Sequence, residues 1–453
     1  MSFPRYAAYK DSGVEWLGEV PQGWVAKRLQ DVSSHQKYSF VDGPFGSDLK
    51  NEEYTDDGVP LIQLNNIYNS KHVLNATRFI SEEKANSLIR HNAFPNDIVI
   101  AKMADPVARA AMVLEAYPRY VIVADCIRLA VNKNQYSVPF LVYTINCPFF
   151  RASAEVLSSG ITRQRINLGS IKKIQFACPS LSEQTTIAAF LDCETAKIDN
   201  LINEQKKLIE LLKEKRQAVI STAVTKGLNP HAPMKDSGVE WLGEVPEHWG
   251  VFPLKNMCEL IKDGTHLPPP RVADGIPLLS VRNISNNGFF CLREDDSLIS
   301  IADYNDLCRS FTPQKNDIIL AIVGATLGKT AVIPDGLGCF QIQRSVAIFR
   351  TLDFIKHSWL YFSFVNDQFQ KLLWQYASFS AQPGIYLGAL TNFKLAFPDI
   401  SEQTAILAFL DQETAKIDNL IQQAQKATTL LQERRTALIS AAVTGKIDVR
   451  GFV

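Results

Sequence analysis

The 453-residue sequence lacks a net charge, a closely spaced cysteine pair and a long apolar run. Lys plus Arg and Asp plus Glu each number 47, so any site for a polyanion must be local. The eight cysteines stand singly, without the CxxC spacing of zinc or redox sites, which predicts reduced thiols in a cytosolic protein. No apolar run approaches the roughly 20 residues of a membrane span, and the N-terminus lacks a secretory-signal pattern. We therefore expect a soluble, cytoplasmic protein.

Motifs that carry catalysis are also missing. The run from Gly324 to Thr330 resembles a phosphate-binding loop, but Val323 stands where that loop needs its first glycine. The matching segment of the first half lacks both glycines, so we expect a tight turn that presents Arg109 and Lys329 from equivalent places. The sequence has no HExxH, no GxSxG, no methyltransferase cofactor loop and no carboxylate pair at a nuclease spacing. We expect no catalytic residue and no metal site in this chain.

The sequence contains a long internal repeat. Residues 10–21, KDSGVEWLGEVP, recur letter for letter at 235–246, an offset of 225. Residues 182–202 recur at 401–421 with three changes and an offset of 219. The stretches between these blocks differ in sequence and length but share a skeleton, such as NDIVIA at 96–101 and NDIILA at 316–321. We expect two domains of one fold with different surfaces, related by a pseudo-twofold internal duplication.

The domain boundaries follow from the repeat. Short apolar runs bounded by Gly, Pro, Asn and Asp predict strands in both divergent stretches, and Pro139–Val156 and Phe354–Tyr376 each predict a helix, which makes both domains α+β. The predicted order is an N-terminal repeated segment at 1–24, a globular domain at 25–180, a central helix at 181–227, a linker with the second repeated segment at 228–249, a second globular domain at 250–399 and a C-terminal helix at 400–446.

Each repeated helical block predicts one long amphipathic helix. Ser182 and Ser401 are plausible N-caps, and Gly227 and Gly445 end the two helices. About 40 helical residues span roughly 60 Å. The apolar stripe on each helix favours antiparallel pairing of the two as a coiled coil.

Local charge distinguishes the two divergent domains. No acidic residue occurs from Val156 to Leu181, and the loop at 160–167 carries two arginines, a glutamine and an asparagine that can donate to phosphates and base edges. The alternative is an ordinary solvated loop. The matching stretch at 379–386 has no cation but keeps Gln382 and Tyr386. If both loops face a ligand, they recognise different features of it.

The repeated blocks DSGVEWLGEVP and SEQ…IAxFLDxETAKIDNLI, placed around two dissimilar domains, resemble the specificity subunit of type I restriction-modification enzymes. NDIVIAKMADPVARAAMV and NDIILAIVGATLGKTAVI also resemble this family's target-recognition domains, although Ala104 and Ala108 stand where such domains often have glycine. The resemblance implies that each domain reads one half of an asymmetric, bipartite double-stranded DNA target. It also implies that the helices act as a spacer and dock two modification subunits.

The same resemblance places all chemistry on partner subunits. It implies S-adenosylmethionine on the modification subunits, which methylate adenine, and ATP with Mg²⁺ on restriction subunits that complete the nuclease. Candidate residues for DNA contact are Lys102, Arg109, Arg163, Gln164, Arg165, Arg282, Asn283, Lys329, Arg344, Gln382 and Tyr386. Candidate residues for partner binding are Ile198, Leu201, Ile202, Leu212, Ile417, Leu420, Ile421 and Leu431. Two alternatives stay open: a helical protein–protein scaffold without DNA recognition, and a self-contained modification or restriction enzyme.

Overall fold

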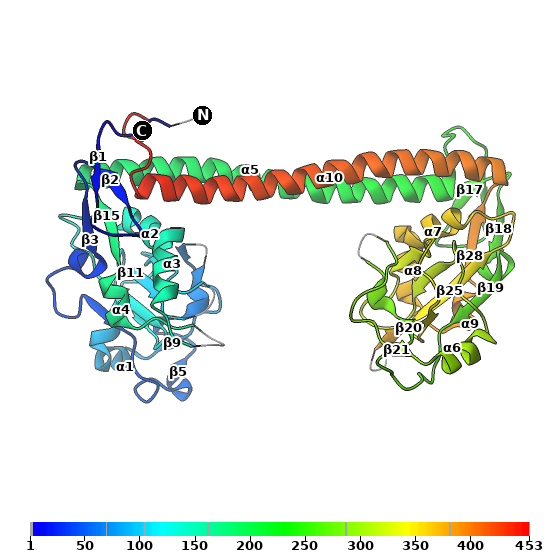
Figure 1. Cartoon of the computed structure of the whole chain (residues 1–453), viewed down its shortest axis with the longest axis horizontal. Helices are drawn as coiled ribbons and strands as arrows, with labels where there is room; N and C mark the ends of the chain where they lie inside the picture. The colour runs from blue at the N-terminus through cyan, green and yellow to red at the C-terminus, as the bar shows by residue number, and fades with distance from the viewer. Residues whose placement is uncertain are drawn as a thin grey trace. The chain divides into compact units, whose positions relative to one another are not determined.

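The computed structural model describes residues 3–68, 70–103, 106–160, 164–285, 288–379 and 382–452 (Figure 1). The chain folds into two compact units. Unit 1 combines Met1–Gln205 with Lys426–Val453, and unit 2 is the continuous segment Lys206–Gln425. Each unit therefore holds one globular domain, one repeated segment and a part of both long helices.

Two sheets form the globular domain of unit 1. The larger has the strand order β4–β14–β11–β12–β8–β7, and the smaller has the order β10–β13–β6–β9–β5. The strands of the larger sheet are β4 (Phe40–Asp42), β14 (Cys126–Leu129), β11 (Ile98–Ala101), β12 (Ala110–Met112), β8 (Lys71–His72) and β7 (Ile67–Tyr68). Those of the smaller are β10 (Asn92–Ala93), β13 (Tyr120–Ile122), β6 (Val59–Ile62), β9 (Phe79–Ile80) and β5 (Tyr54–Thr55).

Unit 2 repeats the central part of this topology. One sheet has the order β19–β25–β22–β23 and corresponds to β4–β14–β11–β12; the other has the order β21–β20–β24 and corresponds to β9–β6–β13. The strands are β19 (Cys258–Asp263), β25 (Val346–Thr351), β22 (Ile318–Ala321), β23 (Thr330–Val332), β21 (Leu298–Ile299), β20 (Ile276–Leu279) and β24 (Gln341–Ile342). The expectation that both domains share one α+β fold is confirmed.

The continuous apolar runs become central strands that are buried on both sides. In β11, Ile98 and Ile100 belong to the core beneath the long helices, whereas Val99 and Ala101 belong to the core between the sheets. In β22, Ile318 and Leu320 likewise belong to the core beneath the long helices, whereas Ile319 and Ala321 belong to the core between the sheets. Successive side chains of a strand point to opposite faces, so a four-residue apolar run serves two cores at once.

Each helix expected in the globular domains is broken into two. The segment predicted at Pro139–Val156 forms α2 (Val138–Asn146) and α3 (Pro148–Val156), because the residue before Pro148 takes an extended conformation. The segment predicted at Phe354–Tyr376 forms α7 (His357–Val365) and α8 (Asp367–Gln375), and between them the Asn366 side chain accepts a hydrogen bond from the Gln368 N–H. The prediction of one helix in each place is wrong.

The remaining elements are short. The pairs β3–β15 and β18–β28 join the globular domains to the long helices, and β26–β27 is a small hairpin in unit 2. The strands are β3 (Val25–Arg28), β15 (Gln175–Cys178), β18 (Gly250–Pro253), β28 (Lys394–Phe397), β26 (Ser378–Phe379) and β27 (Pro383–Gly384). The short helices are α1 (Glu82–Ser87), α4 (Leu168–Lys173), α6 (Ile301–Cys308) and α9 (Leu387–Leu390), with 3₁₀ turns at Leu29–Val32, Asn51–Glu53, Leu64–Asn66, Ile89–His91, Leu254–Asn256 and Val281–Asn283.

The two long helices are α5 (Leu181–Lys226) and α10 (Ile400–Val443). Their caps are not the predicted serines, because Ser180 Oγ accepts the Glu183 N–H and Asp399 Oδ1 accepts the Glu402 N–H. Gly227 and Gly445 end them with φ of +72° and +73°, as predicted. Throughout the described residues, no helix is long and apolar enough to cross a membrane.

A buried glutamine ties the start of each long helix to its globular domain. Gln184 is 1% exposed; its Oε1 accepts the Ser137 N–H and its Nε2 donates to the Pro179 carbonyl. Gln403 is fully buried and makes the same contacts with Lys356 and Pro398. The helix and domain are thereby fixed to each other in the same way in both units.

Each repeated segment packs against the last turns of a long helix. In unit 1 the hairpin of β1 (Tyr9–Asp11) and β2 (Glu19–Pro21) leads to Trp24, which is buried in one core with Ala442 and Val443 of α10. In unit 2 the hairpin of β16 (Met234–Asp236) and β17 (Glu244–Pro246) leads to Trp249, which packs with Ala223 and Val224 of α5. The repeated sequence therefore forms the same hairpin, packed in the same way against the end of a long helix, in each unit.

Candidate nucleic-acid interface

Four segments of unit 1 meet where β4 and β11 end. The Lys102 backbone, just after β11, accepts from Ile166 N–H at 2.9 Å and donates to the Asp125 carbonyl at 2.8 Å. The Lys102 ammonium pairs with Asp42 at 3.2 Å, and Arg165 pairs with Asp125 at 2.9 Å. Asp42, at the end of β4, thus lies within one connected network with the predicted basic loop.

Unit 2 builds the same frame with different side chains. Ile385 N–H donates to the Ile322 carbonyl and Ile322 N–H to the Ser345 carbonyl, at 3.0 and 2.9 Å. Arg344 N–H donates to the Thr265 carbonyl at 3.2 Å, just after β19. We call these two sites the reading faces. That of unit 1 comprises Asp42–Phe45, Lys102, Asp125 and Gln164–Ile166; that of unit 2 comprises Asp263–Leu267, Ile322, Arg344–Ser345 and Gln382–Tyr386.

The reading faces bring together six of the predicted DNA-contact residues. Gln164 and Arg165 are exposed in unit 1, and Arg344, Gln382 and Tyr386 are exposed in unit 2. Lys102 also lies there, but its side chain is only 9% exposed and its charge is neutralised by Asp42. The structure therefore gives the Lys102 side chain an internal partner in place of the predicted DNA contact. Arg163 lies outside the described residues.

Arg109 and Lys329 occupy equivalent turns, as predicted. The Ala101 N–H donates to the Arg109 carbonyl at 2.9 Å, and the Ala321 N–H donates to the Lys329 carbonyl at 2.8 Å. The Arg109 guanidinium, however, donates to the carbonyls of Leu64 and Ile67, both at 2.8 Å. It stabilises an internal turn, whereas the Lys329 side chain is half-buried.

The prediction that Asn283 contacts DNA is wrong, because the side chain is 1% exposed and hydrogen-bonded within the chain. Its Oδ1 accepts the Ser280 N–H at 2.9 Å, and its Nδ2 donates to the Cys291 carbonyl at 3.0 Å. Asn66 holds the corresponding turn of unit 1. The neighbouring Arg282 is exposed but pairs with Asp295 at 2.8 Å.

The sequence interpretation missed the loops that follow β4 and β19. Each begins with Asp-Gly, at 42–43 and 263–264, and each then exposes a large apolar side chain. Phe45 is 80% exposed and Leu267 is 87% exposed. The detectable signal was the Asp-Gly pair itself, which is typical of a sharp turn.

Titratable groups behind the reading face of unit 1 are held neutral by burial. Burial lowers the pKa of His91, whose Nδ1 lies 2.7 Å from the Asp42 carbonyl oxygen. Burial also raises the pKa of the Cys126 thiol to about 12, which keeps it protonated and unreactive. The charge presented by this face therefore comes from its arginine and carboxylates.

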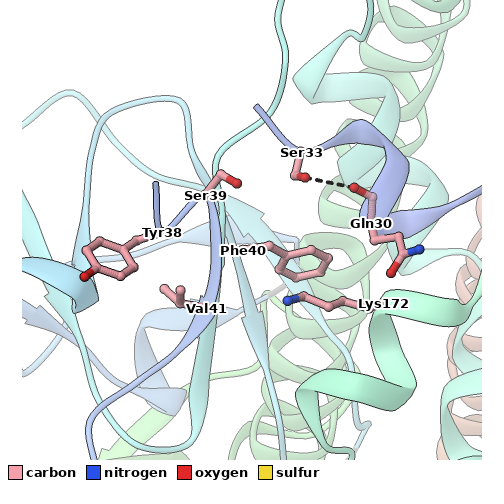
Figure 2. Close-up of a pocket in the computed structure, with 7 residues that line it drawn as sticks. All are labelled: Gln30, Ser33, Tyr38, Ser39, Phe40, Val41 and Lys172. Carbon is pink, nitrogen blue, oxygen red and sulfur yellow. Dashed lines mark hydrogen bonds between the residues drawn. The ribbon is translucent and has the colours of Figure 1, made fainter. Parts of the chain in front are cut away.

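A shallow pocket of about 280 Å³ lies at the opposite end of β4 (Figure 2). Its lining residues are Gln30, Ser33, Tyr38, Ser39, Phe40, Val41 and Lys172. Ser33 Oγ donates to the Gln30 carbonyl at 2.8 Å, and the Lys172 ammonium lies 5.1 Å from the centre of the Phe40 ring. None of the residues that form the reading faces lines this pocket.

The described residues contain no group of three or more His, Cys, Asp or Glu side chains placed to hold a metal ion. The buried thiols of Cys178 and Cys258 are poor nucleophiles, since burial raises their pKa values to about 11 and about 12. What the two reading faces offer is hydrogen bonding, charge and apolar contact, which are means of recognition.

The long helices provide a second candidate surface, and half of the predicted partner-binding residues do not belong to it. Ile198, Ile202, Leu212 and Ile417 are at most 9% exposed, so they pack within the chain and the predicted partner contact is wrong for them. Ile421 and Leu431 are half-buried. Leu201 and Leu420, which are equivalent in the repeat, are 51% and 48% exposed. The equivalent pair Leu211 and Leu430, which the sequence interpretation missed, is 52% and 53% exposed.

The family model described as "Type I restriction modification DNA specificity domain" matches residues 21–211 and 246–428. These two matches cover most of the chain and coincide with its two copies. The chain belongs to the family of type I restriction-modification DNA specificity domains.

Relatives of similar length agree with this assignment. The chain is 24% identical to the type I restriction enzyme EcoBI specificity subunit of Escherichia coli over 97% of this chain and 90% of that protein. It is 23% identical to a putative type I restriction enzyme MjaX specificity subunit of Methanocaldococcus jannaschii over 96% of each chain. These relatives are specificity subunits, so the comparison assigns the chain a non-catalytic role within a restriction-modification enzyme.

The fold also matches solved structures. A chain from the structure "Structural basis underlying complex assembly and conformational transition of the type I R-M system" aligns with a TM-score of 0.70 at 16% identity, covering 94% of this chain and 98% of that one. The crystal structure of the HsdS subunit from Thermoanaerobacter tengcongensis aligns with a TM-score of 0.54 at 15% identity, covering 96% and 98%. At such identities the likeness concerns the fold alone.

Proposed function

We propose that this chain is the DNA-specificity subunit of a type I restriction-modification system and that each reading face recognises one half of a bipartite, asymmetric DNA target. The observation that carries the proposal is the pair of equivalent backbone frames with different exposed side chains. Unit 1 presents Arg165 and Gln164, whereas unit 2 presents Arg344, Gln382 and Tyr386. Arginine and glutamine donate to base edges or phosphates, so one frame can read two different sequences.

The helices dock two copies of one partner in this proposal. In unit 1, Leu201 of α5 and Leu430 of α10 are about half exposed; in unit 2, Leu420 of α10 and Leu211 of α5 take the equivalent places. Two like surfaces suit two like partners. We propose that these partners are modification subunits, which hold S-adenosylmethionine and methylate an adenine in each half. Restriction subunits with ATP and Mg²⁺ complete the enzyme, and the helices between the domains set the spacing of the two halves.

The test uses the full chain assembled with its modification subunits, with methylated adenines mapped by sequencing. Arg165→Ala is expected to relax recognition or weaken binding in the first half of the target alone, and Arg344→Ala in the second half alone. A lost base contact costs about 1–3 kcal/mol, roughly five- to 150-fold in discrimination. The matched control is Arg434→Ala, an exposed arginine of α10 outside both reading faces.

Three results would count against the proposal. If Arg165→Ala and Arg344→Ala both leave the target and the affinity unchanged, the reading faces do not bind DNA. If the assembled complex methylates without sequence preference, the chain is a helical scaffold. Methyl transfer by the purified chain alone would instead support a self-contained enzyme.

A further inference from the structure

Two strongly exposed apolar side chains occupy equivalent loops of the two units. Phe45 follows Asp42, the last residue of β4, by three positions; Leu267 follows Asp263, the last residue of β19, by four. Their exposed fractions are 80% and 87%. Among the described residues, neither side chain belongs to a buried apolar cluster, so the folded chain makes no evident use of either.

The start of each loop is fixed in place. A Cβ added at Gly43 would lie 1.9 Å from the Val123 carbonyl oxygen, and one at Gly264 would lie 2.3 Å from the Ile342 carbonyl oxygen. The Gly43 and Gly264 N–H groups donate to the carbonyls of Cys126 and Val346. Both loops therefore leave the sheet at a closely packed point that only glycine permits.

The loop tips are held by local hydrogen bonds. The Phe45 carbonyl accepts the Asp48 N–H at 2.9 Å, which closes a turn directly after the aromatic residue. The Thr265 hydroxyl donates to the Leu267 carbonyl at 3.0 Å. Prolines at 44 and 268–270 limit both loops further. The apolar side chains thus project from defined points of the reading faces, beside the segments that carry Asp125 and Arg344.

We propose that Phe45 and Leu267 are base-reading residues, each of which contacts the 5-methyl group of a thymine in its half of the target. This inference rests on the proposed function. An apolar side chain offers no hydrogen bond to a phosphate or a base edge, and the apolar feature of the major groove is the thymine methyl group. Because one loop presents a phenyl ring and the other a branched aliphatic chain, this contact adds to the difference between the two halves.

The experiment replaces thymine by deoxyuridine, which lacks the methyl group. Once the target is mapped, duplexes with this change at each thymine of either half are titrated with the complex of the full chain and its modification subunits. At one thymine of the first half, the wild-type complex is expected to lose about four- to tenfold in affinity, the effect of leaving one methyl group uncovered. The Phe45→Ala complex is expected to bind both duplexes equally. Leu267→Ala should act likewise in the second half.

Controls separate this inference from the proposed function. Val25→Ala removes a 46% exposed side chain on β3, outside the reading face, and should keep the wild-type preference for thymine. Circular dichroism and thermal unfolding verify that Phe45→Ala is folded. A target without thymine in either half, a wild-type complex indifferent to every such change, or a Phe45→Ala complex with the wild-type preference would overturn the inference. If Arg165→Ala or Arg344→Ala still alters the target or the affinity in that case, the proposed function stands; if neither variant does, both fall.

Discussion

The Arg435 guanidinium donates two hydrogen bonds to the carboxylate of Asp199, at 2.8 Å from Nε and 3.2 Å from Nη2. In unit 2, Arg216 donates in the same way to Asp418, at 2.9 and 3.3 Å. Positions 199 and 418 are equivalent in the repeat, as are 216 and 435. One contact between α5 and α10 is therefore made twice, with the helices exchanging roles, and it fixes their antiparallel pairing within each unit.

We expect Arg435→Ala to lower the free energy of unfolding by about 0.5–1 kcal/mol, since the pair is partly exposed and screened by water. The exchanged variant, Asp199→Arg with Arg435→Asp, should recover most of this loss because it restores opposite charges. Denaturant unfolding of the four variants of a double-mutant cycle measures the coupling, and added salt should reduce it. A coupling free energy of zero would show that the two side chains lie close without stabilising the helix pair.

The exposed leucines predict the stoichiometry of assembly. Leu201→Ser with Leu430→Ser removes apolar surface from the helices of unit 1 and should abolish binding of one of the two modification subunits. Leu211→Ser with Leu420→Ser should abolish binding of the other. Native mass spectrometry of the assembled complex counts the bound subunits.

The control for this experiment is Leu228→Ser, which changes a 43% exposed leucine just after α5. It should leave both subunits bound. All of these leucines are roughly half exposed, so the variants should unfold near the temperature of the wild type. Two bound subunits in every variant would place the docking surface elsewhere.

His72 predicts a dependence of stability on pH. The side chain is 3% exposed, its Nδ1 accepts the Leu114 N–H at 3.2 Å, and burial lowers its pKa to about 4. In the unfolded chain the pKa is about 6.5. The unfolded state therefore gains a proton as the pH falls below about 6.5, while the folded state does not until about pH 4.

This difference should lower the stability progressively between pH 6.5 and pH 4, by about 2–3 kcal/mol at most. Above pH 6.5 the group contributes no pH dependence. In His72→Gln, where an amide oxygen can still accept the Leu114 N–H, this part of the pH dependence should disappear. Unfolding free energies at pH 7.5, 6 and 5 compare the two proteins. An equal loss of stability in both on acidification would assign the effect to other groups.

The repeat made the common topology predictable. Its short apolar runs are buried on both sides, and a run of this kind favours a central β-strand. The breaks between α2 and α3 and between α7 and α8 were missed since apolar spacing continues across them. Pro148 marks the first break in the sequence, but Asn366 makes the second by a side-chain hydrogen bond that no spacing rule reveals. The N-caps of the two long helices were mispredicted for a related reason. The residues able to cap these helices are Ser180, Ser182, Asp399 and Ser401, and only the fold selects among them.

The candidate site was predictable in part. Exposed residues of the divergent loops, such as Arg165 and Tyr386, were found from local charge and from the comparison of the two copies. Asn283 was misassigned because the sequence alone does not distinguish an asparagine that completes a buried turn from one that binds a ligand. Ala108 shows the converse, since it adopts φ of +61° where Gly328 has +91° and so keeps the turn without the glycine.

Unit 1 is built from both ends of the chain. Its core includes Leu438, Ile439 and Val449, and the Pro4 carbonyl accepts the Asp448 N–H at 2.8 Å. Unit 2 ends at Gln425, so a ribosome has translated all of it before the last strip of the unit 1 core is made. The domain whose synthesis begins first is thus completed last, and a chain cut short after Gln425 would contain all of unit 2 and leave the core of unit 1 open.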